Sequence, residues 1–81
     1  MKNLPYSLEA EREVLGAMMR NRNALLNGVA RLSEDDFFEA DHKLIFSTIK
    51  NVHARGSIVD VVTVVEQLNL NNNQSKQNLK P

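Results

Sequence analysis

The sequence contains no cysteine and no tryptophan, and it has only three glycines and two prolines among its 81 residues. Without cysteine, neither a disulfide framework nor a thiolate metal site can form. No apolar run approaches the roughly 20 residues that a transmembrane helix needs, and the first five residues lack the hydrophobic segment of a signal peptide. We therefore expect a small cytoplasmic protein that does not contact a membrane.

Clustered positive charge is also missing. All ten acidic residues lie between Glu9 and Glu66, together with seven of the ten basic residues, which leaves that span with a net charge of −3. Strong nucleic-acid binding needs clustered Lys and Arg. The candidate bases are Arg12, Arg20, Arg22 and Arg31. Acids at positions 9, 11 and 13 surround Arg12, and we expect intrahelical ion pairs to account for Arg12 at least. The charge pattern argues against direct binding of DNA or RNA.

Motifs for catalysis or metal binding are absent as well. No G-x-x-x-x-G-K-[ST] phosphate loop is present, which excludes ATP hydrolysis by this chain alone. His42 and His53 are eleven residues apart on one expected helix, about 16 Å along its axis, so they cannot share a metal ion. We interpret His42 as a surface histidine near a helix start. The acids at 34–36, Glu39 and Asp41 are interpreted as helix caps and a solvated patch, and no catalytic, cofactor or metal site is expected.

Helical patterns fill the first half of the chain. Ser7 is a good N-cap for a helix that runs to about Arg20, and Gly16 in its middle predicts that another helix crosses close to the backbone there. One of Met18 and Met19 should be buried and the other should lie at the rim. The apolar face of this helix is predicted to comprise Leu8, Val14, Leu15, Met18 and Met19.

Two shorter elements follow. Residues 21–23 are predicted to form a turn in which Asn23 caps a helix over residues 24–30, with Leu25, Leu26 and Val29 inward. Residues 33–36 resemble a capping box that opens one more short turn. Because adjacent residues cannot share one helix face, we expect one of Phe37 and Phe38 to pack inside and the other to be partly exposed.

A second long helix is predicted from Asp41 to Arg55, where Gly56 provides a C′ glycine. Its apolar face is predicted to comprise Leu44, Ile45, Thr48, Ile49 and Val52. Residues 58–65 are rich in β-branched side chains, which favour a strand. Asp60 is nevertheless a good N-cap, apolar residues recur at helical spacing up to Leu68, and a lone strand would be unstable, so the residues by themselves leave both a strand and a helix open.

The composition changes after Leu68. Residues 69–81 include five Asn, two Gln and two Lys, with two leucines as the only aliphatic side chains. Such a segment cannot bury enough surface to offset its ordering entropy. We therefore predict a folded domain over residues 1–68, followed by a flexible, disordered Asn-rich tail over residues 69–81.

Three blocks of sequence, in this order, carry a resemblance to a known family. They are P-x-S-L-E-A-E-x-x-V-L-G-A at residues 5–17, D-F-F at 36–38 followed by H-K-L-I-F at 42–46, and G-x-I-V-D-x-V-T-V-x-E-x-L at 56–68. Together they resemble the N-terminal domain of bacterial replicative DNA helicases of the DnaB type. The resemblance implies an all-α head, a small orthogonal bundle of about five helices that carries no ATPase chemistry. It is also the chief reason to predict a helix and not a strand after Asp60. In that family, heads associate within the helicase hexamer, and the domain takes part in docking primase or helicase loader proteins.

The chain departs from the family pattern after residue 68, where family members continue into a long helical hairpin that builds the collar and much of the primase-binding surface. Here we expect the polar tail in place of the hairpin, and no motor domain. The head fold carries over, and the first helix near Glu9 and the Phe38–His42 segment are places that a partner would touch. The candidate partner-contact residues are Glu9, Arg12, Met19, Phe38 and His42.

Two hypotheses about function follow. In the first, the chain is the head of a replicative helicase and scaffolds helicase subunits with primase or loader. In the second, it is a stand-alone phage or mobile-element protein that resembles the head and regulates host helicase, loader or primase. A small DNA-binding regulator is disfavoured by the negative folded segment. Without the collar hairpin, the isolated chain should be a monomer or a weak dimer, and a stable hexamer in light scattering would contradict this.

Overall fold

The computed structural model describes residues 7–78, and it describes the side chains of residues 7–72. Within this range all regular structure is helical, which confirms the expected all-α class. The described residues form four α-helices and one short 3₁₀ helix, η1, where about five helices were predicted. In chain order they are α1 (Leu8–Arg20), α2 (Arg22–Arg31), η1 (Glu34–Asp36), α3 (Ala40–Ala54) and α4 (Val61–Asn78). None of these helices is long and apolar enough to cross a membrane.

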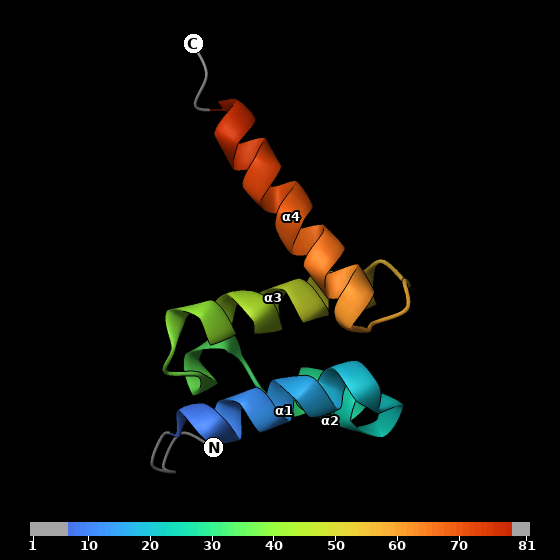
Figure 1. The fold of residues 1–81 in the computed structure, drawn as a ribbon. Helices are drawn as coiled ribbons and strands as arrows, with labels where there is room; N and C mark the ends of the chain where they lie inside the picture. Colours follow the sequence, from blue (N-terminus) through green and yellow to red (C-terminus); the bar gives the residue numbers. More distant parts are fainter. Residues whose placement is uncertain (1–6, 79–81) are drawn as a thin grey trace.

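The first two helices form a hairpin, α3 packs against α1, and α4 contacts α3 and then runs away from the body (Figure 1). Asn21 alone makes the corner of the hairpin. Its backbone N–H donates to the Ala17 carbonyl at 2.8 Å and ends α1, while its side-chain Oδ1 accepts from the Ala24 N–H at 3.0 Å and caps α2. The predicted turn over residues 21–23 with Asn23 as the cap is therefore wrong, because one extended residue serves both helix ends.

The core joins all four helices. Phe46, Ile49 and Val52 of α3 are completely buried, and they are joined by Leu15, Met18, Leu25, Phe37 and Val64. Three leucines that were predicted to face inward are instead 41–52% exposed, namely Leu8, Leu26 and Leu44. On α3 the reason is a rotation of the buried stripe: it runs through His42, Phe46 and Ile49, so Leu44 lies on the outer side.

Close helix packing occurs at Gly28 and not at Gly16. A Cβ atom at Gly28 would lie 2.7 Å from both Sδ and Cε of Met18, so the buried methionine of α1 occupies the space that a larger α2 residue would need. At Gly16 the nearest atoms belong to Arg20 of the same helix, which makes the predicted helix crossing there wrong. Met18 is the buried member of its pair, and Met19 is partly buried against the core.

Both ends of the loop between α3 and α4 follow the predicted local signals. Gly56 adopts a positive φ of 83°, its N–H donates to the His53 carbonyl, and Ser57 N–H donates to the Val52 carbonyl, which completes a Schellman motif. Asp60 and Thr63 cap α4 reciprocally, since each side-chain oxygen accepts from the other residue's N–H at 2.9–3.0 Å. The helix predicted after Asp60 is confirmed.

The structure differs from the expected disordered tail. The backbone of residues 69–78 continues α4, and residues 79–81 lie outside the described range. A helix that is already nucleated by a good cap extends through local hydrogen bonds without a core, and here the Gln67 side chain also donates to Asn71 Oδ1 at 3.0 Å. The boundary at residue 68 and the flexibility of the segment beyond it stay predictions.

Candidate functional site

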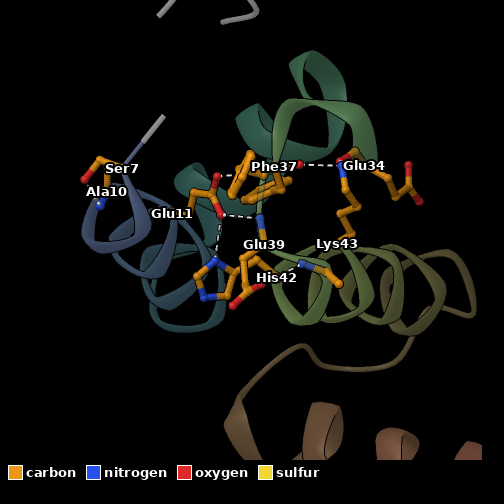
Figure 2. A network of polar contacts seen from close by, with 10 residues as sticks. Ser7, Ala10, Glu11, Glu34, Phe37, Glu39, His42 and Lys43 are labelled. Atoms are coloured by element: carbon orange, nitrogen blue, oxygen red, sulfur yellow. Dashed lines mark hydrogen bonds and ion pairs between the residues drawn. The ribbon is translucent and has the colours of Figure 1, made fainter. Parts of the chain in front are cut away.

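A buried carboxylate joins α1 to the segment between η1 and α3. Glu11 is only 7% exposed, although it is charged and lies on a helix whose neighbouring acids are exposed. Its Oε2 accepts from the Phe38 N–H at 2.6 Å, and its Oε1 accepts from the Glu39 N–H at 3.3 Å. The same Oε1 lies 2.7 Å from Nδ1 of His42 (Figure 2). We call this set of contacts the Glu11 clamp.

The contact with Glu11 determines which ring nitrogen of His42 donates a hydrogen bond. An ionised carboxylate can only accept hydrogen bonds, so Nδ1 of His42 must carry the proton that points at Glu11. Both Glu11 oxygens are then occupied by N–H donors of the chain itself. The pair thus holds two segments together that are 31 residues apart in sequence.

The clamp determines which way the two adjacent phenylalanines face. Phe37 is 4% exposed, and its ring centroid lies 5.0 Å from that of Phe46 in a tilted arrangement. Phe38, whose N–H donates to Glu11, is 61% exposed. This confirms the prediction that one of the pair packs inside while the other is partly exposed.

Two lysines of α3 hold the same segment from the other side. The Lys43 ammonium donates to the Glu34 carbonyl at 3.2 Å and to the Phe37 carbonyl (Figure 2). Lys50 pairs with Glu34 Oε1 at 3.1 Å and lies 5.3 Å from the Phe46 ring centroid. The segment from η1 to α3 is therefore held through its N–H groups by Glu11 and through its carbonyls by Lys43. An exposed aromatic side chain at position 38 is thereby presented on a fixed backbone.

The surroundings of Glu11 favour its charged form. Burial alone would raise the pKa of Glu11, but the hydrogen bonds from Phe38, His42 and Glu39 outweigh it, so the pKa lies below its usual value. The pKa of Glu34 is also lowered, chiefly by a hydrogen bond from its own backbone and by the Lys50 ammonium. Both groups add stability only while they are ionised.

Acid should therefore weaken the fold through these two carboxylates. Because their folded pKa values lie below the unfolded ones, their contribution is complete above the unfolded value, near 4.3 for Glu, and is lost as pH falls through the folded value. We expect the urea midpoint to be steady from neutral pH to about pH 5 and to drop steadily below it. Glu11→Gln should flatten this drop, whereas Glu13→Gln, an exposed residue of the same helix, should leave it unchanged.

A Glu11→Gln variant whose urea midpoint falls below pH 5 as steeply as that of the wild type would contradict the assignment of this acid sensitivity to Glu11. If that variant is largely unfolded at neutral pH, Glu34→Gln provides the second test, since the pKa of Glu34 is lowered as well and its side chain is only partly buried.

Two of the five predicted partner-contact residues meet at the clamp. Phe38 lies on the surface, in agreement with a contact role. His42, in contrast, is only 9% exposed, and the interpretation of it as a surface histidine is wrong because its ring turns inward to Glu11. As a direct partner contact His42 offers little surface, although it supports the segment that presents Phe38.

The other three residues lie on α1 outside the clamp. Glu9 and Arg12 are exposed, while Met19 is partly buried near the opposite end of the helix. Within the described residues, the close contacts between basic and acidic side chains are those of His42 with Glu11 and of Lys50 with Glu34, so the intrahelical pairs expected for Arg12 are not formed there. A partner role for these three residues stays a prediction.

The residue that sequence reasoning missed is Glu11 itself. The signal was available: positions 11, 15 and 18 lie at helical spacing, and Leu15 and Met18 belong to the buried stripe of α1. A carboxylate within an apolar stripe is buried only when it has partners. Those partners come from residues far along the chain, and no local pattern names them.

The acidic residues of the η1 region serve as caps and partners. Asp36 Oδ2 accepts from Ser33 N–H at 2.9 Å within the predicted capping box, and Glu39 Oε1 accepts from Ala40 N–H at 3.0 Å at the start of α3. That start lies one residue before the predicted Asp41. Within residues 7–72, no group of three or more potential ligands could hold a metal ion.

Comparison with known proteins gives the class of this helical head. The DnaB-like helicase N-terminal domain model matches residues 3–80, and the chain belongs to that family. The resemblance drawn from the three sequence blocks is thereby confirmed. No solved structure matches the chain.

Similar curated proteins include replicative DNA helicases named DnaB. The chain is 38% identical over 65 residues to the one from Buchnera aphidicola subsp. Baizongia pistaciae, which covers 80% of this chain and 14% of that protein. It is 42% identical over 64 residues to the one from Geobacillus stearothermophilus, and the match covers 79% of this chain and 14% of that protein. It is 34% identical over 64 residues to the one from Mycobacterium leprae, and the match covers 79% of this chain and 11% of that protein. The chain thus spans about one seventh or less of the length of these relatives.

Proposed function

We propose that this chain is a non-catalytic protein-interaction module of the DNA replication machinery, the head of a replicative helicase N-terminal domain that scaffolds helicase subunits with primase or a helicase loader. The observation that carries the proposal is Phe38. It is 61% exposed, yet its backbone is tied to the buried carboxylate of Glu11. An exposed aromatic side chain on a rigid backbone is the kind of anchor that dominates protein interfaces.

The rigidity matters for affinity. Binding loses free energy when loops must become ordered, and a segment that is already held loses less. The backbone around Phe38 is held by hydrogen bonds to Glu11 and from Lys43, and the η1 capping box holds the residues just before it. The backbone of the proposed contact surface is thus preorganised in the free chain.

The family match and the names of the relatives support the helicase head over the stand-alone regulator. The non-catalytic role is supported by the absence of a phosphate loop from the sequence and by Glu11 oxygens that are engaged with the chain's own donors. The charge of −3 between Glu9 and Glu66 supports a protein partner over a phosphate backbone. A cytoplasmic location and a monomer or weak dimer in isolation stay predictions.

Replacing Phe38 with alanine tests the proposal. With purified helicase, primase and loader from the same cell, we expect the wild-type chain to bind at least one of them, and Phe38→Ala to weaken that binding about 30-fold, as for an interface hot spot. Calorimetric titration measures the affinity. Leu26→Ala is the matched control, since Leu26 is an exposed aliphatic residue on α2.

The free energy of unfolding should be nearly unchanged in Phe38→Ala, because most of that side chain is already in water. Equal losses of affinity in the Phe38 and Leu26 variants, or no binding of the wild-type chain to any of the three proteins, would reject the proposal.

A further inference from the structure

A second feature lies at the other end of α3 from Phe38. A cavity of about 350 Å³ opens between the α1–α2 corner and the loop that joins α3 to α4. Three basic side chains, Arg20, Arg22 and His53, line it together with apolar ones that include Met19, Leu25 and Ile58. Among its lining residues none is acidic. The nearest acid along the chain, Asp60, uses its carboxylate to cap α4.

Helix stability explains two of these bases but not the third. Arg20 and His53 lie in the last turns of α1 and α3, where positive charge offsets the helix dipole. Arg22 is the first residue of α2, where the dipole disfavours a cation, and that first turn contains no acid. A charge that opposes the stability of its own helix, at the mouth of a cavity, indicates a role outside folding.

The apolar part of the cavity narrows the class of ligand. Ile58 is 77% exposed, the highest fraction among the large exposed hydrophobic residues of the described chain. It lies beside a cavity whose floor includes Leu25, which is 4% exposed. A ligand that suits both halves carries a negative group and an apolar group close together.

We propose that this cavity binds a short acidic peptide segment of a partner protein. A carboxylate of that segment lies against Arg22 and Arg20, and an adjacent aliphatic side chain covers Ile58 and Met19. The size of the cavity suits a few side chains. A nucleic-acid backbone fits less well, because its phosphates carry no adjacent apolar group for Ile58. The inference does not depend on Phe38, and the two sites can be tested separately.

Titration of the ¹⁵N-labelled chain by NMR tests the inference. The probe is the tetrapeptide acetyl-Leu-Asp-Leu-Glu-amide, and its neutral counterpart acetyl-Leu-Asn-Leu-Gln-amide is the ligand control. We expect the acidic peptide to move the amide signals of Asn21, Arg22, Gly56 and Ser57 most. Arg22→Ala should weaken binding about tenfold, as for loss of a hydrogen bond to a charged group. Arg31→Ala, an exposed arginine in the last turn of α2, should bind as the wild type does.

Arg20→Ala serves as the second variant if the spectrum of Arg22→Ala shows loss of the fold. No shifts around the cavity, equal binding of the neutral peptide, or equal losses in the Arg22 and Arg31 variants would overturn the proposal. A short oligothymidylate that moves the same amides at lower concentration than the acidic peptide would also overturn it, in favour of a nucleic-acid site.

Discussion

Glu11→Ala is expected to lower the free energy of unfolding by about 3 kcal/mol, as when one partner of a buried polar network is removed. The truncation leaves the N–H groups of Phe38 and Glu39 and the ring of His42 without their shared acceptor. A chain of this size has only a few kcal/mol of stability in total. The variant should therefore be substantially unfolded, and urea denaturation followed by far-ultraviolet circular dichroism measures this.

Two further variants separate the clamp from the loss of a charge. Glu11→Gln keeps one acceptor oxygen and should lose roughly half as much stability. Glu13→Ala removes an exposed carboxylate two positions along the same helix and should change stability by less than about 0.5 kcal/mol. A Glu11→Ala variant as stable as Glu13→Ala would show that the clamp contributes nothing to the fold.

Phe46→Ala should have an effect of about 3–5 kcal/mol, the usual range for deleting a buried aromatic ring. Phe46 is completely buried, and its ring contacts that of Phe37 and lies under the Lys50 ammonium. Its removal leaves a cavity beneath the segment that the clamp holds. The exposed Phe38 segment should thus become mobile together with the core, and amide hydrogen exchange at residues 37–39 should speed up with unfolding.

The control for this change is Leu44→Ala on the same helix. Leu44 is 52% exposed, so its truncation should cost less than about 1 kcal/mol. If Phe46→Ala is unfolded throughout, Phe46→Leu gives a measurable loss of roughly 1–1.5 kcal/mol. A Phe46→Leu loss no greater than that of Leu44→Ala would contradict the position of Phe46 at the centre of the core.

The helix ends were predictable where a local signal decides them. Ser7, Gly56 and Asp60 act as the caps that their residue types indicate, because a cap needs only backbone groups within a few residues. Asn21 was missed because a residue that ends one helix and caps the next leaves no turn between them. Helix α4 was correctly chosen over a strand, but chiefly from the family resemblance, because the β-branched composition and the Asp60 cap signal pointed in opposite directions. The structure adds the reciprocal cap between Asp60 and Thr63 that begins this helix.

Packing was less predictable than the helices. Spacing alone cannot fix the rotation of a helix in which several faces carry apolar residues, so Leu44 was assigned to the core in place of Phe46. The close approach was expected at Gly16, whereas it occurs at Gly28, because the outcome depends on which side chain reaches across. In both cases the packing of one helix against another determines which residue is buried, and local sequence patterns do not predict such contacts.

In the candidate site, too, a local feature was predictable and a tertiary contact was not. That one of the two phenylalanines is buried and the other exposed follows from adjacency on the chain and was foreseen, but adjacency does not say that Phe37 is the buried one. The clamp was not, because Glu11 and His42 meet only after α3 has packed on α1. A buried carboxylate paired with a histidine is a tertiary feature, and from sequence alone each residue is read as a surface charge.

The most direct test of the proposed interaction role is photo-crosslinking from position 38 in the cell of origin. Phe38 is replaced by p-benzoylphenylalanine, a bulkier aromatic that this exposed position accommodates, and crosslinked proteins are identified by mass spectrometry. The same substitution at the exposed Leu26 of α2 is the control. We expect crosslinks to the replicative helicase, primase or loader from position 38 and not from position 26. No crosslink from position 38, or the same set of proteins from both positions, would contradict a specific contact at Phe38.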